Sequence, residues 1–222
     1  MSFFLTYSTE GGEYLLQPGG YAALAILIIL LLLLGSSLSG KTQSKPINTK
    51  QLVFCGIAIA LAFVASYIKF ADLPFGGSVT MFSMLFVSII GYLYGPKMGI
   101  MAGISFGILQ LIADPYILTP VQAILEYPIA FGCLGLSGFF NHSKNGLIKG
   151  YLLGVTGRYL CHVASGYLFF RAYVPEGMNP FAYTFGYNAT YIVPEMIATI
   201  VLIFLPPMAK AIKRIKQMAT QV

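Results

Sequence analysis

The sequence lacks tryptophan and is poor in both charged residues and cysteine. Lys, Arg, Asp and Glu make up 9% of its 222 residues, whereas 57% are hydrophobic. Soluble domains carry about 25% charged residues, so this composition excludes an ordinary soluble domain and indicates a protein embedded in lipid. The three cysteines, Cys55, Cys133 and Cys161, all lie in apolar stretches. Their spacing excludes a disulfide framework and a metal-binding motif, and each thiol should pack as a small hydrophobic group.

Seven apolar stretches predict an all-α integral membrane protein. They fall at about 21–39, 51–70, 79–95, 98–113, 118–140, 147–171 and 182–207, near the roughly 20 residues that cross a hydrocarbon core. A polar linker sets the first stretch apart. We therefore expect residues 1–48 to form an external segment, one additional transmembrane helix and a cytoplasmic linker. Residues 49–222 should form a six-helix membrane domain with a basic cytoplasmic tail.

The positions of the basic residues predict how the chain is oriented in the membrane. With the N-terminus outside, two basic residues, Lys69 and Arg171, fall on the external side. Ten fall on the inner side: Lys41, Lys45, Lys50, Lys97, Lys144, Lys149, Lys210, Lys213, Arg214 and Lys216. This asymmetry follows the positive-inside rule and predicts a multi-pass protein of the bacterial plasma membrane with a cytoplasmic C-terminus. Topology thus accounts for the net charge of +6, and nucleic acid is not an expected partner.

The string Gly35-Ser-Ser-Leu-Ser-Gly-Lys-Thr42 matches the phosphate-binding loop pattern GxxxxGK[ST]. That loop works only between a strand and a helix, where backbone N–H groups surround the phosphates. Here a leucine run precedes the string and Pro46 follows it closely. We therefore interpret it as a chance match at the end of a span and predict no ATPase site and no enzymatic activity.

Ionisable side chains inside the spans are the clearest functional signal. A charge at the bilayer centre costs roughly 2.5–3.5 kcal/mol on insertion scales, so it persists only with a partner or a function. Helix geometry places Arg158 and Glu195 at one depth, where we expect a structural ion pair. Nearer the external side it groups five intramembrane residues, with one more in the loop above them. These six are Glu126, Tyr127, His162, Tyr183, Asn188 and Tyr116.

This outer group has the chemistry of a pocket for a small, flat, cationic heteroaromatic molecule. If Arg158 pairs with Glu195, no cation remains at that depth for Glu126. The carboxylate would then balance a ligand's charge, while aromatic rings stack on the ligand or make cation–π contacts. The loops 69–80 and 113–120 are rich in glycine and proline, and we expect them to form a lid.

Three segments resemble the thiamine-specific S components (the ThiT family) of energy-coupling factor (ECF) transporters. They are Gln122-Ala-Ile-Leu-Glu-Tyr-Pro-Ile-Ala-Phe131, Arg158-Tyr-Leu-Cys-His-Val-Ala-Ser-Gly166 and Phe181-Ala-Tyr-Thr-Phe-Gly-Tyr-Asn188. The resemblance implies a subunit that captures thiamine from outside and needs no cofactor. It also implies docking onto an ECF module of one transmembrane coupling protein and two ATPases. The implied ligand-binding residues are Glu126, Tyr127, Tyr116, His162, Tyr183 and Asn188.

Two further expectations follow from this resemblance. Family members stack the ligand on tryptophans, and Phe170 stands where one of these would lie. Members dock through small residues on the first helix of the six, which here implies Gly56, Ala58, Ala60 and Ala62. Small residues let helix backbones approach closely in lipid.

Three alternatives remain open from the sequence. The chain could be an S component for another vitamin or precursor, such as hydroxymethylpyrimidine. It could be a stand-alone carrier in which Glu126 and His162 relay protons. An intramembrane enzyme is disfavoured, because the sequence shows no metal-ligand cluster and no nucleophile–base pair.

Overall fold

The computed structural model describes residues 5–8, 13–19 and 48–220. The predicted first span at 21–39 and the string at 35–42 lie outside the described residues. Near the N-terminus, β1 (Leu5–Ser8) pairs with β2 (Glu13–Leu16) in an antiparallel hairpin. The rest of the described chain is almost entirely helical.

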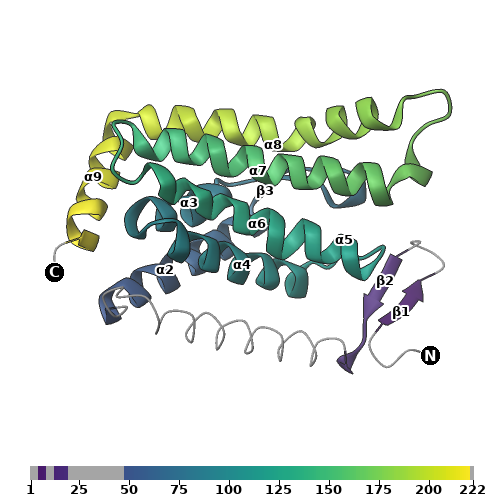
Figure 1. Cartoon of the computed structure of the whole chain (residues 1–222), viewed down its shortest axis with the longest axis horizontal. Helices are drawn as coiled ribbons and strands as arrows, with labels where there is room; N and C mark the ends of the chain where they lie inside the picture. Colours follow the sequence, from purple (N-terminus) through teal and green to yellow (C-terminus); the bar gives the residue numbers. More distant parts are fainter. Residues whose placement is uncertain (1–4, 9–12, 20–47, 221–222) are drawn as a thin grey trace.

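The main body is a bundle of helices that run roughly along one axis (Figure 1). It comprises α2 (Thr49–Tyr67), α3 (Ser83–Tyr94), α4 (Pro96–Ala113), an irregular helical segment (Pro120–Phe140), α7 (Gly146–Phe169) and α8 (Pro180–Phe204). These six segments correspond to the six apolar stretches predicted from 51 to 207. A final helix, α9 (Pro206–Thr220), turns away from the end of α8.

Four of the described helical segments are long and apolar enough to cross a membrane. They are Thr49–Tyr67, Pro96–Ala113, Pro120–Phe140 and Pro180–Phe204. α3 is shorter, with 12 residues, while α7 has 24 residues and carries Arg158 and His162. α7 lies alongside α8 in the bundle (Figure 1).

Caps and breakers in the sequence set the helix boundaries. Asn48 begins α2 with a capping box: its side chain accepts from the Lys50 N–H at 3.1 Å, and Gln51 accepts from the Asn48 N–H at 3.3 Å. α3 and α4 meet at Gly95, whose φ of 89° requires glycine, and Pro96 occupies the first turn of α4.

Residues 69–80 form a β-hairpin rather than the ends of two spans. β3 (Lys69–Asp72) pairs antiparallel with β4 (Ser78–Thr80), and the short 3₁₀ turn η1 (Pro74–Gly76) lies between them. The predicted apolar stretches 51–70 and 79–95 include Lys69, Phe70, Val79 and Thr80 at their ends. Backbone pairing between the two short strands explains why α2 already ends at Tyr67 and α3 begins only at Ser83.

The largest apolar cluster of the described residues joins all six bundle segments. Its buried members are Ala62, Met84, Val87, Phe106, Phe131, Leu134, Tyr151, Val155, Tyr191 and Ile192. The irregular segment packs closely on α4: a Cβ added at Gly107 would collide with the carbonyl oxygen of Tyr127. This contact fixes the backbone of the segment that carries Glu126.

Candidate functional site

A cavity opens at the end of the bundle where α7 ends and α8 begins. The seven residues predicted to bind the ligand all line it, together with Arg158: Glu126, Tyr127, His162, Tyr183, Asn188, Tyr116 and Phe170. They come from the irregular segment, α7, α8 and the connecting loops. The structure therefore brings the predicted group together.

Glu126 and Tyr127 lie in a π-helical turn, η2 (Leu125–Ile129), between α5 (Pro120–Ile124) and α6 (Ala130–Gly132). Pro128 lies inside this turn. Because proline has no N–H and its ring crowds the preceding turn, it disrupts regular α-helical bonding. Wide turns of this kind occur frequently at functional sites. Pro128 thus explains why the helix widens where its two polar side chains enter the cavity.

The Glu126 carboxylate is held by a neutral neighbour. Gln122, fully buried at 0% exposure, donates from Nε2 to Glu126 Oε2 at 2.5 Å. The same amide donates to the Tyr116 carbonyl at 3.2 Å and accepts from the Leu118 N–H at 3.0 Å. Gln122 therefore ties Glu126 to the loop above it. Gln122 is not among the residues predicted for the site, although its position one turn from Glu126 is a usable signal.

Tyr127 uses its hydroxyl to shape the same loop. It accepts from the Tyr116 N–H at 2.9 Å and donates to the Asp114 carbonyl at 3.0 Å. The Tyr116 ring then stacks on Phe170, with centroids 5.9 Å apart and planes 15° from parallel. Tyr116 and Phe170 thus present a flat aromatic wall to the cavity.

α7 and α8 supply the opposite side of the cavity. Arg158 donates from Nε to His162 Nε2 at 3.3 Å, so that imidazole nitrogen acts as an acceptor. Asn188 donates to the Thr184 carbonyl at 2.9 Å and accepts from the Tyr191 hydroxyl at 2.5 Å. These bonds orient the amide of Asn188, which is 5% exposed.

The predicted direct ion pair between Arg158 and Glu195 does not form. Among the described residues, the two ion pairs are those of Lys69 with Asp72 and Asp114. Glu195 instead accepts from the Thr80 N–H and hydroxyl, both at 2.9 Å. The Arg158 guanidinium lies 4.1 Å from the centre of the Phe131 ring. The two opposite charges act on each other at longer range, because depth along two helices does not fix which way their side chains point.

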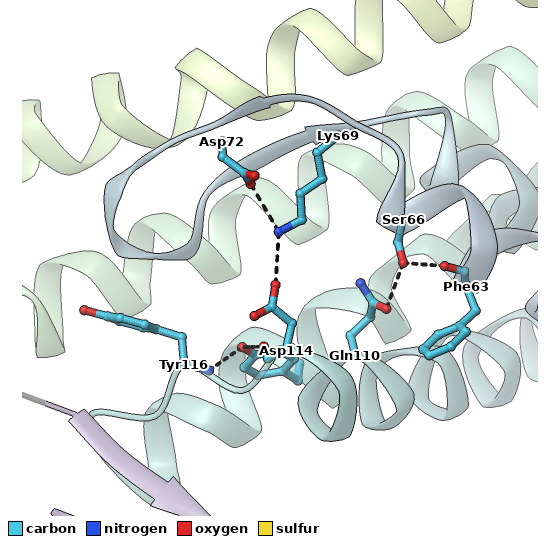
Figure 2. Close-up of polar contacts among 8 residues, drawn as sticks. Phe63, Ser66, Lys69, Asp72, Gln110, Asp114 and Tyr116 are labelled. Atoms are coloured by element: carbon cyan, nitrogen blue, oxygen red, sulfur yellow. Dashed lines mark hydrogen bonds and ion pairs between the residues drawn. The ribbon is translucent and has the colours of Figure 1, made fainter. Parts of the chain in front are cut away.

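The β3–β4 hairpin covers the cavity and is fastened on two sides. Lys69 Nζ lies 3.1 Å from Asp114 Oδ2, in the loop before α5, and 3.2 Å from Asp72 Oδ1 (Figure 2). On the other side the Tyr187 hydroxyl donates to the Pro74 carbonyl. A Cβ added at Gly77 would lie 2.8 Å from the Tyr191 ring. Sequence reasoning placed a lid at 69–80 but missed its fastening residues, Lys69, Asp114 and Tyr187.

The ionic fastening persists over the neutral pH range. Partial burial alone would lower the pKa of Lys69, but the hydrogen bonds and negative charges of Asp114 and Asp72 outweigh it and hold the pKa above its ordinary value of 10.5. Lys69 is therefore predominantly charged throughout the neutral pH range.

The small residues predicted to dock are divided between two faces of α2. Gly56 and Ala60 are exposed, and Ala58 is half-buried against a cluster that includes Cys55 and Ile90. Ala62 is fully buried in the core, so its assignment to the docking surface is wrong. A spacing of four residues cannot tell which face of a helix turns outward.

The part of the chain that the structure describes shows no group of three or more His, Cys, Asp or Glu side chains positioned to hold a metal ion. Cys133 and Cys161 are free thiols with sulfurs 3.9 Å apart. The cavity is lined by hydrogen-bonding groups, aromatic rings, the Glu126 carboxylate and the Arg158 guanidinium.

Comparisons with known proteins identify the family of the chain. The family model "Thiamine transporter protein" matches residues 52–215. The thiamine transporter ThiT of Bacillus subtilis is 32% identical over 178 residues, covering 71% of this chain and 92% of the relative. ThiT of Lacticaseibacillus paracasei is 34% identical over 119 residues, covering 46% of this chain and 59% of the relative.

A solved structure shares the fold. ThiT from Listeria monocytogenes superposes with a TM-score of 0.63 at 24% identity, covering 76% of this chain and 96% of that one. The all-α membrane architecture predicted from the sequence is thereby confirmed. The relatives are named transporters, which agrees with the prediction of a transport protein rather than an enzyme. Because the family model spans most of its length, this chain belongs to the thiamine transporter protein family.

Proposed function

We propose that this chain is the substrate-capture subunit of a vitamin importer, binding thiamine from the extracellular side and docking onto an ATP-driven ECF module. One observation carries the proposal: in an aromatic cavity that Arg158 also lines, the Glu126 carboxylate forms no direct ion pair with any residue that the structure describes. Its hydrogen bond comes from the neutral amide of Gln122, while Lys69 pairs with Asp114 and Asp72. A cationic ligand can therefore balance its charge.

The other cavity residues suit the rest of such a ligand. The stacked pair of Tyr116 and Phe170 offers a flat surface for a ring, and Tyr183 stacks on Tyr187 with centroids 6.3 Å apart. Aromatic faces attract cations as well as flat rings. Asn188 and His162, oriented by their hydrogen bonds, supply polar groups for the ligand's edges. The naming of the relatives as thiamine transporters favours thiamine over another vitamin.

The proposed orientation places the cavity outside and α9 in the cytoplasm. The end of the bundle opposite the cavity is rich in basic residues. Lys97 lies in the first turn of α4, Lys149 in the first turn of α7 and Lys144 in the loop before α7. α9 adds further basic residues at this end. The positive-inside rule assigns that end to the cytoplasm. The β3–β4 hairpin then forms the extracellular lid.

The proposed docking surface is the exposed face of α2 at Gly56 and Ala60. A Cβ added at Gly56 meets nothing within 4 Å, so another helix has room to approach there. In lipid, close backbone approach at small residues is a main source of helix association.

Uptake into vesicles tests this function against its alternatives. With the full chain and an ECF module in the membrane, we expect thiamine accumulation that requires ATP. Unlabelled thiamine should compete more strongly than hydroxymethylpyrimidine. Accumulation driven by a pH gradient without the module would contradict the proposal and favour a proton-coupled carrier.

A further inference from the structure

The last helix, α9, lies across the end of the bundle opposite the cavity (Figure 1). Its Met208, Ile212 and Ile215 are half-buried at one-turn spacing, and Ile212 packs against a buried cluster that includes Leu147 and Ile203. The outer face instead carries the exposed residues Lys210 and Arg214, and the exposed Lys213 lies at the edge between the two faces. An amphipathic helix with a basic outer face is typical of a segment that lies in a membrane interface.

Specific contacts hold α9 in this position. Lys216 Nζ donates to the Asn141 carbonyl at 2.8 Å and lies 4.1 Å from the centre of the Tyr92 ring on α3. α9 is therefore a docked element with a defined orientation. Its outward side chains have a fixed place relative to the membrane-spanning helices.

A groove runs between α9, the end of α8 and the start of α7. One part of its lining is apolar, formed by Leu147, Ile148, Ile203 and Phe204, and Lys213 lies at another part. α7 also begins at this groove, and a helix N-terminus carries partial positive charge. The groove thus joins an apolar surface to a positively charged one.

The depth and the charge of the groove both match a lipid headgroup region. α8 has 25 residues and is therefore about 37 Å long, more than the roughly 30 Å of the hydrocarbon core. Its end at Phe204 lies at headgroup level when the helix spans the membrane. Residues 141–150 and 205–222 contain no Asp or Glu but six basic residues: Lys144, Lys149, Lys210, Lys213, Arg214 and Lys216.

We propose that this groove binds an anionic phospholipid. The acyl chain lies along Ile148 and Phe204, the more exposed apolar residues of the groove, and the headgroup phosphate lies at Lys213, with Arg214 adding attraction from the outer face. Basic residues near a membrane surface attract anionic lipids by electrostatics. An acidic protein segment would satisfy the lysines but would leave the apolar part of the groove unfilled.

Native mass spectrometry of the full chain in detergent tests this assignment. Phosphatidylglycerol and phosphatidylcholine with the same acyl chains are added in equal amounts. We expect the wild type to retain phosphatidylglycerol at least fivefold more than phosphatidylcholine. The double variant Lys213→Gln/Arg214→Gln should retain both lipids equally. These side chains are exposed, so the fold should persist.

The matched control removes two charges from the same end of the bundle, away from the groove. Lys50→Gln/Lys97→Gln should keep the wild-type preference, because both residues are exposed and neither lines the groove. Equal retention of the two lipids by the wild type would overturn the proposal. The proposal would also be overturned if the control variant lost its preference for phosphatidylglycerol as fully as the Lys213/Arg214 variant. That result would show that the overall positive charge of this end attracts the lipid, and not a specific site.

Discussion

At the scale of single residues, the site depends on side chains that hold other side chains in place. Gln122 joins Glu126 to the loop at 116–118, and Tyr127 joins the same loop to the π-helical turn. Both residues use backbone groups of the loop as partners. The carboxylate and the aromatic wall therefore keep a fixed relation to each other before any ligand binds, which reduces the ordering cost of binding.

Lys69 provides a residue-scale prediction about the lid. Because its ion pair with Asp114 fastens the hairpin over the cavity, Lys69→Met should speed thiamine dissociation roughly twofold to fivefold, as expected for an exposed ion pair. The wild-type rate should approach that of the variant at high salt, which screens exposed charges. Rapid-dilution release of labelled thiamine measures both effects. Lys97→Met, at the far end of the bundle, is the matched control.

The raised pKa of Lys69 fixes the sign of the pH effect. The pKa of Lys69 is higher in the folded protein than its unfolded value of 10.5. The charged lysine therefore stabilises the closed lid fully at pH values below 10.5. That stabilisation is lost as the pH rises through the folded-state pKa. The difference in release rate between wild type and Lys69→Met should therefore persist from pH 7 to 9 and shrink above 10.5. A difference that disappears between pH 7 and 9 would exclude the fastening role.

At the scale of helices, close backbone packing sets the position of Glu126. α4 approaches the π-helical turn at Gly107, next to the carbonyl of Tyr127. Any side chain at position 107 must push the turn away. The irregular backbone of the turn therefore depends on α4 as well as on Pro128.

Gly107→Ala should lower both stability and affinity. Overpacking a tight contact costs typically 1–3 kcal/mol, and the displaced turn carries Glu126 and Tyr127. Gly186→Ala on α8 is the matched control, because a Cβ there meets nothing within 4 Å. Thermal unfolding in detergent, followed with thiamine titration, compares the two. If Gly107→Ala behaves like Gly186→Ala in both measurements, the close packing does not position the site.

At the scale of the whole molecule, the two ends of the bundle differ in chemistry. One end of the bundle contains the cavity and its lid, with the acidic residues Asp72, Asp114 and Glu126. The opposite end of the bundle carries the basic residues of α9. α2 connects these ends and presents Gly56 and Ala60 on its exposed face. A partner that contacts this face can therefore reach the molecule without entering the cavity.

Ala60→Trp should block assembly with the ECF module while thiamine still binds. The indole would occupy the space that a partner helix needs for close approach, and position 60 lies outside the cavity lining. Val201→Trp, at another exposed position on α8, is the control and should assemble normally. Co-purification with the module reports assembly. Normal assembly of Ala60→Trp would move the docking surface elsewhere.

The sequence predicted the six bundle segments and the members of the cavity because hydrophobic length and helix depth are local properties. Glu126 and His162 stood out because charge inside an apolar stretch is costly. The sequence did not reveal that Arg158 and Glu195 lack direct contact or that Ala62 is buried, because both depend on how helices rotate about their axes. The partners of Gln122 and the fastening of Lys69 to Asp114 involve loop geometry that hydrophobic patterns do not encode.

The central claim is that Glu126 balances the charge of bound thiamine, and calorimetric titration of thiamine into the purified protein tests it most directly. Calorimetry suits a chain without tryptophan. We expect nanomolar to low-micromolar affinity for the wild type. Glu126→Gln should bind at least tenfold more weakly, a loss of about 1.4 kcal/mol, while Glu176→Gln, at an exposed loop position, should bind normally. Near-normal affinity of a well-folded Glu126→Gln protein would contradict the claim.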